Sequence, residues 1–187
     1  MRVVGGTARG RHLRAPSSGS TRPTGDRVRE ALFSMLTSLD RIEGSTVLDL
    51  FAGSGALGIE SLSRGAARAV FVDSSAEAVA AIRENLAVLG PDQDKATVVR
   101  SDALRFLAGA PGFDLVLADP PYSYDRWPEL LDLLVGGTGL LVAETGSPWE
   151  PGPGWETVKV KKYGGTVVSI AQPAVPVSVP PAEEGEI

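Results

Sequence analysis

The tetrapeptide Asp119-Pro120-Pro121-Tyr122 holds the residue types with the clearest chemistry in this sequence. Successive prolines fix two φ angles and remove two backbone donors, so the turn is rigid and its acceptors can point at one place. Acceptors aimed at an exocyclic base amine stabilise the positive charge that its nitrogen gains when it attacks a methyl group. Tyr122 offers a ring on which an extruded base can stack. The pattern predicts methylation of a base amine; an ordinary Pro-Pro turn behind a capping aspartate is the structural alternative.

The segment Asp49-Leu-Phe-Ala-Gly-Ser-Gly-Ala-Leu-Gly58 has glycines at 53, 55 and 58, the spacing G-x-G-x-x-G of nucleotide-binding loops. It follows an apolar run and precedes a helical pattern, as such a loop requires, although a strand-to-helix turn can use glycines for geometry alone. Asp73 stands 24 positions beyond Asp49, where a carboxylate can bind both ribose hydroxyls of an adenosine. The segment therefore predicts a cofactor that contains adenosine.

Asp49 helps to separate the two cofactors that such a loop could bind. The glycine run of a dehydrogenase usually begins directly after an apolar strand, whereas an acidic residue stands here four places before the first glycine. A carboxylate favours a positively charged ligand, and S-adenosylmethionine (SAM) carries a sulfonium and an ammonium. A nicotinamide-dependent oxidoreductase stays an alternative, but it leaves Asp119 to Tyr122 without a role. Asp102 is placed either to accept from an adenine amino group or to cap a following helix.

Strand and helix patterns alternate around these motifs. Apolar runs predict buried strands at residues 46–50, 69–72, 97–99, 113–118 and 140–143. Helical spacing predicts helices at residues 28–39, 56–64, 74–89, 103–107 and 128–134. The alternation predicts an α/β, Rossmann-like fold: a mostly parallel sheet with helices on both faces and ligands at the carboxyl ends of the strands. Residues 155–172 predict a closing antiparallel hairpin that turns at Tyr163-Gly-Gly-Thr166.

Two of the predicted helices have expected boundaries. A polar cap within Thr24 to Asp26 opens the helix at 28–39. The helix at 74–89 is expected to open with a capping box of Ser74 and Glu77 and to close at Gly90-Pro91.

Composition sets the limits of the molecule. With 187 residues, 43% of them hydrophobic, the chain is expected to form one methyltransferase domain, at residues 23–172. A basic arm at 1–22 precedes this domain. A proline-rich acidic tail at 173–187 follows it and is expected to be disordered. Cysteine is absent and His12 is the only histidine, so neither a disulfide framework nor a metal site is expected. The chain has no signal-peptide pattern and no apolar run long enough for a membrane helix. A cytoplasmic location is expected.

Charge is divided unevenly along the chain. Residues 1–30 carry seven arginines against two carboxylates, a net charge of +5, and the remaining residues carry -10. A basic arm on an acidic body is expected to bind nucleic-acid phosphates, and a solvated terminus is the alternative. The candidate RNA-binding residues are Arg9, Arg11, Arg14, Arg22 and Arg27.

Taken together, the motifs resemble the RsmD-type 16S rRNA guanine-N2 methyltransferases of bacteria, within the class I SAM-dependent group. The matching stretches are Arg2-Val-Val-Gly-Gly6 with Arg9-Gly-Arg11, Arg22-Pro-Thr24 with Asp26 to Glu30, Leu48 to Gly58, Asp119 to Tyr122 and Lys161 to Thr166. The resemblance implies methyl transfer from SAM to a guanine amino group of 16S rRNA, within a partly assembled 30S subunit, by a monomer without a metal.

The resemblance also implies roles for individual residues. The turn Asp119 to Tyr122 would hold the target amine, and residues 22–27 would border both pockets. The expected cofactor-binding residues are Thr24, Asp49, Phe51, Ala52, Gly53, Ser54, Gly55, Asp73, Ser74, Asp102 and Ala103. One position departs from the family, which usually shows Tyr-Gly-Asp-Thr where this chain has Tyr163-Gly-Gly165-Thr166.

Three further functions stay open at this point. The same amine chemistry serves methyltransferases of DNA adenine and of protein glutamine. A non-catalytic RNA-binding module would use the arm alone.

Overall fold

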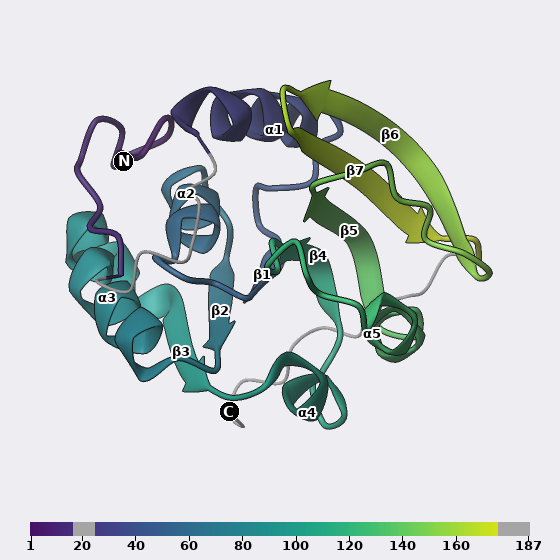
Figure 1. The fold of residues 1–187 in the computed structure, drawn as a ribbon. Coiled ribbons are helices and arrows are strands. Elements are labelled where there is room, and N and C mark those ends of the chain that lie inside the picture. The colour runs from purple at the N-terminus through teal and green to yellow at the C-terminus, as the bar shows by residue number, and fades with distance from the viewer. Residues whose placement is uncertain (17–24, 176–187) are drawn as a thin grey trace.

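The chain forms a seven-stranded sheet flanked by helices (Figure 1). The structure is a computed structural model and describes residues 1–16 and 25–175. The strands are β1 (Thr46–Leu50), β2 (Arg68–Asp73), β3 (Ala96–Arg100), β4 (Phe113–Ala118), β5 (Thr138–Thr145), β6 (Trp155–Tyr163) and β7 (Thr166–Pro173). The helices are α1 (Asp26–Ser38), α2 (Ala56–Ser63), α3 (Ala76–Leu86), α4 (Ala103–Leu107) and α5 (Trp127–Leu134), with a 3₁₀ segment at Ala87–Lys95.

The strand order is β3-β2-β1-β4-β5-β7-β6. The first five of these pair in parallel, and β7 pairs antiparallel with both β5 and β6. The order reverses between β1 and β4, which are neighbours in the sheet but are separated in sequence by β2 and β3. The predicted Rossmann-like sheet with a C-terminal antiparallel hairpin is therefore confirmed, and the reversal between β1 and β4 is where such folds bind ligands.

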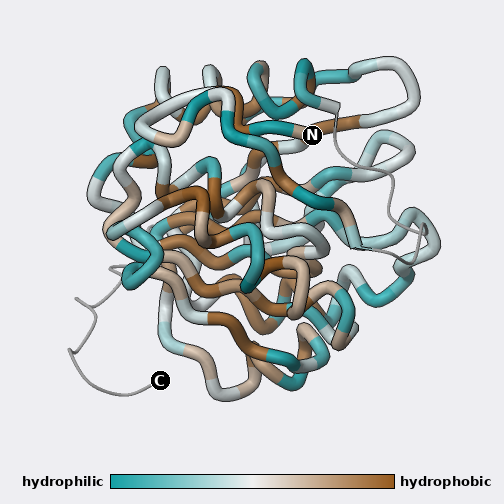
Figure 2. The backbone as a smooth tube through the Cα atoms, turned by 90° about the vertical axis from the view of Figure 1, so that its left-hand side faces the viewer, coloured by the Kyte–Doolittle hydropathy of each residue, from teal (hydrophilic) through white to brown (hydrophobic). Residues whose placement is uncertain are grey.

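Two hydrophobic cores cover the two faces of the sheet. Leu36 of α1, Ile59 of α2 and Ile82 of α3 pack in one core, and Leu104 of α4 and Leu130 of α5 pack in the other. Figure 1 shows the same division, with α1 to α3 on one side of the strands and α4 and α5 on the other. The hydrophobic segments gather in the interior of the molecule (Figure 2). The period-two alternation of each strand, with successive side chains on opposite faces, explains why both cores draw on the same strands.

The start of α3 differs from the predicted capping box. Ser75, not Ser74, precedes the helix, and its hydroxyl accepts from the Ala78 N–H at 3.3 Å. The Asp73 carboxylate accepts from the Ser75 N–H at 2.8 Å. This local bond holds Ser74 in the turn, so the helix begins one residue later than a box opened by Ser74 requires.

The other predicted boundaries of these helices also shift. The helix α3 ends at Leu86, and a 3₁₀ segment continues through Gly90, whose φ of 59° breaks the helical path. At α1 the N-cap position is Gly25, with no side-chain capping bond; Thr24 lies outside the described residues.

The first 16 residues pack against the body of the molecule. Arg2 and His12 form an antiparallel bridge, so this segment is a small hairpin. Val3, Ala8 and Leu13 are buried in the core that contains α1 to α3. The alternative of a solvated terminus is wrong for this stretch, because its apolar positions contribute to the core. In the described part of the chain no helix is long and apolar enough to span a membrane.

Candidate active site at the carboxyl edge of the sheet

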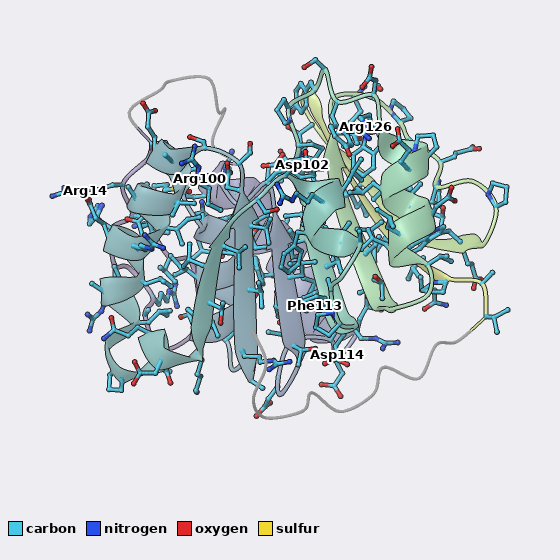
Figure 3. The ribbon with its side chains drawn as sticks, turned by 90° about the horizontal axis from the view of Figure 1, so that it is seen from below. Arg14, Arg100, Asp102, Phe113, Asp114 and Arg126 are labelled. Atoms are coloured by element: carbon cyan, nitrogen blue, oxygen red, sulfur yellow. The ribbon has the colours of Figure 1, made fainter. Side chains whose placement is uncertain are left out.

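The glycine loop and the double-proline turn lie side by side. Leu50, the last residue of β1, pairs in parallel with Ala118, the last residue of β4. The loop that starts at Phe51 and the turn that starts at Asp119 therefore leave neighbouring strands at the same edge of the sheet. Figure 3 labels Asp102 near this edge and Asp114, close to the start of β4, at the opposite edge. The expected juxtaposition of the two motifs is present.

The glycine loop is held by a carboxylate from the next strand. Asp73, at the end of β2, accepts from the Gly53 N–H at 2.8 Å. Gly53 and Gly55 have φ values of 55° and 75°, in the left-handed region where a side chain is strained. Gly55 occupies the N-cap position of α2. The loop thus turns tightly into a helix, and Asp73 fixes its position.

The Asp73 carboxylate keeps capacity for a ligand. One oxygen accepts from Gly53 and the other from Ser75. Because an ionised carboxylate has about four acceptor sites, two of these sites stay available for hydroxyl donors. Asp73 is partly exposed. This geometry is compatible with the predicted contact to two ribose hydroxyls.

Asp49 lies beneath the loop. It is 1% exposed, and its carboxylate accepts from the Gly58 N–H in the first turn of α2 at 2.8 Å. Burial raises the pKa of this carboxyl well above its ordinary value; the Gly58 bond opposes that rise, and the neighbouring carboxylates of Asp119 and Asp73 add to it. Asp49 therefore fixes the start of α2 and can act on a bound cation only through its field.

Asp102 adopts the capping geometry that was one of its two predicted roles. Its carboxylate accepts from the Arg105 N–H at 3.1 Å and caps α4. The residue is exposed at the end of β3, and Ala103 is buried behind it. Since capping uses part of its acceptor capacity, the predicted bond to an adenine amino group stays compatible with this position.

The residues after β4 line a pocket of about 440 Å³. Its lining residues are Pro120, Pro121, Tyr122, Tyr124, Trp127, Glu144, Thr145, Gly146, Ser147, Pro148 and Trp149. The pocket lies in the volume range of about 300–1,000 Å³ that small-molecule sites occupy. The double-proline turn and the segment after β5 form its facing walls.

Tyr122 is fixed at this pocket by two contacts. Its hydroxyl and that of Thr166 are 3.0 Å apart and form a hydrogen bond. A Cβ atom at Gly146 would lie 2.9 Å from Cδ2 of the Tyr122 ring, so the absence of a side chain there lets the ring lie against the backbone. Tyr122 is nevertheless 51% exposed. A large exposed ring held in place is suited to stacking a base.

Four aromatic rings connect the glycine loop with the pocket. The ring centroids of Phe51 and Tyr124 are 5.0 Å apart, those of Tyr124 and Trp127 are 5.7 Å apart, and those of Trp127 and Trp149 are 4.9 Å apart. The Tyr124 hydroxyl is buried and has no hydrogen-bond partner among the described residues. Burial raises the pKa of Tyr124. A buried donor without a partner marks a place where a bound group could supply one.

The sequence and fold of this chain match those of known proteins. The model of a family described as conserved hypothetical protein 95 matches residues 1–172. This chain belongs to that family. The Ribosomal RNA small subunit methyltransferase D of Haemophilus influenzae is 38% identical over 137 residues, which cover 72% of this chain and 70% of the relative. The resemblance to RsmD-type proteins is confirmed.

Two further relatives of this family extend the match. The Bacillus subtilis protein YlbH, assigned as an rRNA methyltransferase, is 41% identical over 153 residues, 77% of this chain and 82% of the relative. The solved structure of the Escherichia coli protein yhhF, assigned as a methyltransferase, aligns with a TM-score of 0.80 at 35% identity and covers 92% of this chain and 97% of that one. The fold of the family therefore spans the sheet, the flanking helices and the hairpin.

The predicted RNA-binding arginines occupy different environments in this family member. Arg14 is exposed and pairs with Glu84 at 3.4 Å. Arg9, Arg11 and Arg27 are exposed, and none of them forms an ion pair with another described residue. Arg22 lies outside the described residues. The arginines with unpaired charge are the better candidates for phosphate contacts.

The arm places Arg9 far from the pocket. The Ala8 N–H donates to the Ser63 hydroxyl at the end of α2 at 2.9 Å. The helix α2 starts at the carboxyl edge of the sheet and spans 8 residues, a length of about 12 Å. Arg9 therefore lies toward the opposite edge, so the phosphate contact predicted for it would be with a part of the RNA distant from the target base.

The closing hairpin carries exposed lysines that were not among the predicted RNA-binding residues. Lys162 pairs in register with Val167, and Tyr163 pairs with Thr166, the partner of Tyr122. Lys161 and Lys162 are exposed on β6, the edge strand. Gly165 lies at the hairpin tip, where RsmD-type proteins usually have aspartate. This chain therefore has no carboxylate beside Thr166 at that position.

The sequence prediction also missed Tyr124, Trp127, Glu144 and Trp149. Trp127 and Trp149 are separated by 22 positions, and neither belongs to a recognised motif. The available signal was position: Glu144 follows the apolar run predicted at 140–143, and Tyr124 and Trp127 follow the double-proline turn. Residues after strand carboxyl ends form the site in this fold class.

Proposed function

We propose that this chain is an SAM-dependent methyltransferase that modifies the exocyclic N2 amino group of a guanine in small-subunit ribosomal RNA. The observation that carries the proposal is the pairing of Leu50 with Ala118, which brings the glycine loop and the double-proline turn to one edge of the sheet. Membership of a family with a relative named Ribosomal RNA small subunit methyltransferase D supports the substrate class.

The residues around the glycine loop fit SAM. Asp73 offers two remaining acceptor sites to ribose hydroxyls, and Asp102 lies at the next strand end for the adenine. The Tyr124 ring packs against Phe51 of the loop, and its buried hydroxyl has no hydrogen-bond partner within residues 1–16 and 25–175. The acidic neighbourhood of Asp49, Asp73 and Asp119 suits a cationic ligand. When bound, SAM supplies an electrophilic methyl group.

The chain's own residues act on the amine. Asp119 and the Pro120 carbonyl accept from the amino hydrogens and keep the nitrogen directed toward the methyl carbon. As the nitrogen–carbon bond forms, the carbon–sulfur bond breaks and sulfur keeps its electron pair. The nitrogen becomes tetrahedral and positive, the Asp119 carboxylate stabilises that charge, and one proton then leaves the nitrogen to an acceptor or to water. A preorganised carboxylate of this kind lowers the barrier because it favours the charged transition state over the neutral amine.

The pocket accounts for how the base is held. Because the N2 amino group is reached only when the nucleotide leaves its stack, the protein has to offer a new stacking surface. Tyr122 provides an exposed ring that Thr166 and Gly146 hold in place. The adjacent volume of about 440 Å³ accommodates the rest of the base.

Labelled methyl transfer tests the proposal. Small-subunit particles and rRNA from a strain lacking the enzyme are incubated with labelled SAM, and the products are digested and mapped as nucleosides. We expect label in N2-methylguanosine and not in DNA or protein. Label in methyladenine of DNA or in a protein glutamine would replace the proposal with those alternatives. Calorimetric binding of NAD in place of SAM would support an oxidoreductase.

The variant Asp119→Ala separates chemistry from cofactor binding. We expect SAM affinity to persist and turnover to fall by about a hundredfold or more, as happens when a preorganised electrostatic partner is removed. Asp125→Ala, which changes an exposed aspartate a few residues further along the same segment, is the matched control and is expected to keep turnover. Unchanged turnover in Asp119→Ala would reject its assigned role.

A further inference from the structure

The pocket after β4 has a second aromatic wall beside the exposed tyrosine of the double-proline turn. Tyr124 follows that turn, Trp127 begins α5, and Trp149 lies in the segment between β5 and β6. Figure 3 labels Arg126, the residue before Trp127, at the same edge of the sheet as Asp102. Two segments, one after β4 and one after β5, therefore bring large rings to one side of the pocket.

These rings are held by contacts with one another and with the core beneath them. The Trp127 ring centroid lies 5.7 Å from that of Tyr124 and 4.9 Å from that of Trp149. All three rings pack against the hydrophobic core that contains α4 and α5, yet each stays partly exposed. Side chains that are already ordered lose little freedom when a ligand binds. The two tryptophans therefore form a preorganised apolar surface of the pocket.

The charges around this wall favour an uncharged occupant. Glu144 is the one charged residue among those that line the pocket. Next to the two tryptophans in the chain, Arg126 pairs with Glu129 at 2.6 Å, and Asp125 and Glu150 are exposed. Carboxylates repel phosphate groups, whereas the flat face of a nucleic-acid base carries no net charge and stacks on aromatic rings. The wall is therefore suited to a base and not to a phosphate.

The target base does not need this wall. In the proposed function its amine lies at Asp119 and Pro120 and its ring stacks on Tyr122, which bonds Thr166 of β7. A purine is smaller than the drug-sized ligands that pockets of this volume bury, so the volume of about 440 Å³ has room beyond the target base. A base that is extruded from its stack also leaves the neighbouring nucleotide without a stacking partner. That neighbour needs a new surface, and the tryptophan wall offers one.

Resting on the proposed function, we propose that Trp127 and Trp149 form a second base-binding subsite, on which a nucleotide next to the target guanine stacks. Stacking there offsets part of the free energy that is lost when the target leaves its stack, so the subsite stabilises the extruded RNA. Because every base has an aromatic face, the subsite accepts any neighbouring base and requires only that one is present.

Abasic nucleotides beside the target test for this subsite. The substrates are small-subunit particles rebuilt from ligated rRNA, with an abasic nucleotide directly before or directly after the nucleotide that the wild-type protein methylates. We expect wild-type kcat/KM to fall about fivefold or more at one of these two positions, as it does when one base–aromatic stack is removed. Replacing the same neighbour with a different base is expected to change kcat/KM by less than about twofold.

The variant Trp149→Leu removes the ring and keeps an apolar side chain against the core. We expect kcat/KM for intact particles to fall about fivefold or more, and the abasic nucleotide to cause little further loss in this variant. RNA affinity should fall without a change in the slope of log K against log salt, because a lost stack releases no counterions. Phe106→Leu changes another partly buried ring of the same core, outside the pocket lining, and is the matched control.

The outcomes separate this subsite from the proposed function. Guanine methylation by the wild-type protein that is insensitive to both abasic nucleotides overturns the subsite and leaves the proposed function standing. Fully additive losses from Trp149→Leu and the abasic nucleotide also overturn the subsite, since the ring and the base would then act independently. An absence of guanine methylation by the wild-type protein overturns both.

Calorimetry with SAM excludes a role of the wall in cofactor binding. The SAM affinity of Trp149→Leu is expected to equal that of the wild-type protein, and weaker SAM binding would assign the wall to the cofactor and overturn the subsite. If Trp149→Leu does not fold, Trp127→Leu takes its place in the same comparison. An abasic loss that persists in full in that variant overturns the subsite.

Discussion

The side-chain amide of Asn85 donates to the carbonyl oxygen of Ser54 at 2.9 Å, a bond that ties α3 to the glycine loop. The same amide donates to the Arg14 carbonyl at 2.8 Å, and the Asn85 carbonyl accepts from the Arg14 N–H at 2.8 Å. Asn85 is 3% exposed. One buried side chain therefore fixes both the N-terminal arm and the loop proposed to bind the cofactor.

Replacing Asn85 with alanine is expected to weaken both attachments. The change leaves the buried Ser54 carbonyl without this donor, at a cost of about 1–3 kcal/mol, and removes both partly buried bonds to the Arg14 backbone. We expect a lower melting temperature and weaker SAM binding by calorimetry. Glu84→Ala, which removes only the exposed ion pair with Arg14, is the control and is expected to change stability by less than about 1 kcal/mol. Equal effects of the two variants would contradict this account.

Asp49→Asn is expected to change the pH dependence of stability. Burial raises the pKa of Asp49 in the folded chain, so the folded state keeps a proton that the unfolded chain has released. Stability therefore falls as pH rises from the unfolded value of about 3.9 through the folded value. Asparagine keeps an acceptor for the Gly58 N–H but carries no charge. The stability of the Asp49→Asn variant should therefore not fall in this way as pH rises.

Melting temperatures between pH 4 and pH 8 measure this difference directly. The Asp49→Asn variant is expected to melt at a higher temperature than the wild-type protein at neutral pH. At pH values where the wild-type Asp49 is ionised, the variant is expected to bind SAM more weakly, because it lacks the field of the carboxylate on a cationic ligand. Parallel pH profiles for the two proteins would show that Asp49 does not control this part of the stability curve.

Gly146→Ala is expected to impair turnover through Tyr122. The added Cβ would lie 2.9 Å from Cδ2 of the ring, so the ring has to move away from its bond with Thr166. We expect kcat/KM for RNA to fall about tenfold or more, since small displacements in a positioned site are costly, while SAM affinity stays the same. Gly109→Ala, where an added Cβ has no neighbour within 4 Å, is the control.

The salt dependence of RNA binding is expected to distinguish two basic surfaces. Each phosphate contact that is removed lowers the slope of log K against log salt by about one unit. The double variants Arg9→Ala with Arg11→Ala and Lys161→Ala with Lys162→Ala are both expected to lower that slope. Only loss of the lysine pair, on the hairpin whose Thr166 bonds Tyr122, is also expected to reduce kcat. A flat salt dependence of the wild-type protein would refute phosphate contact at either surface.

Arg29 is expected to behave differently from the exposed arginines. It is 1% exposed, and its guanidinium donates to the Arg2 carbonyl and to Asp26 at 2.8 Å. Arg29→Ala should lower the melting temperature, because it leaves the Arg2 carbonyl without this donor and opens space in the core. The salt slope should stay unchanged. A lower slope at wild-type stability would mean that Arg29 reaches RNA.

Local patterns in the sequence determined the elements and the order of the motifs. The apolar run at 113–118 and the helix at 103–107 match β4 and α4 at both ends, because short periodic segments bounded by turn residues depend little on distant contacts. The glycine spacing predicted the loop at the end of β1 for the same reason. The alternation of strands and helices was sufficient to predict the Rossmann-like sheet.

Tertiary structure decided which residues meet across the sheet. Glu144 and Trp149 join Tyr122 in one pocket because β5 lies beside β4, and Thr166 reaches Tyr122 because β7 inserts between β5 and β6. The arm arginines look alike in sequence, yet Arg29 is buried, Arg14 is paired and Arg9 lies toward the far edge. Strand order and side-chain burial arise from long-range packing, which no local spacing encodes.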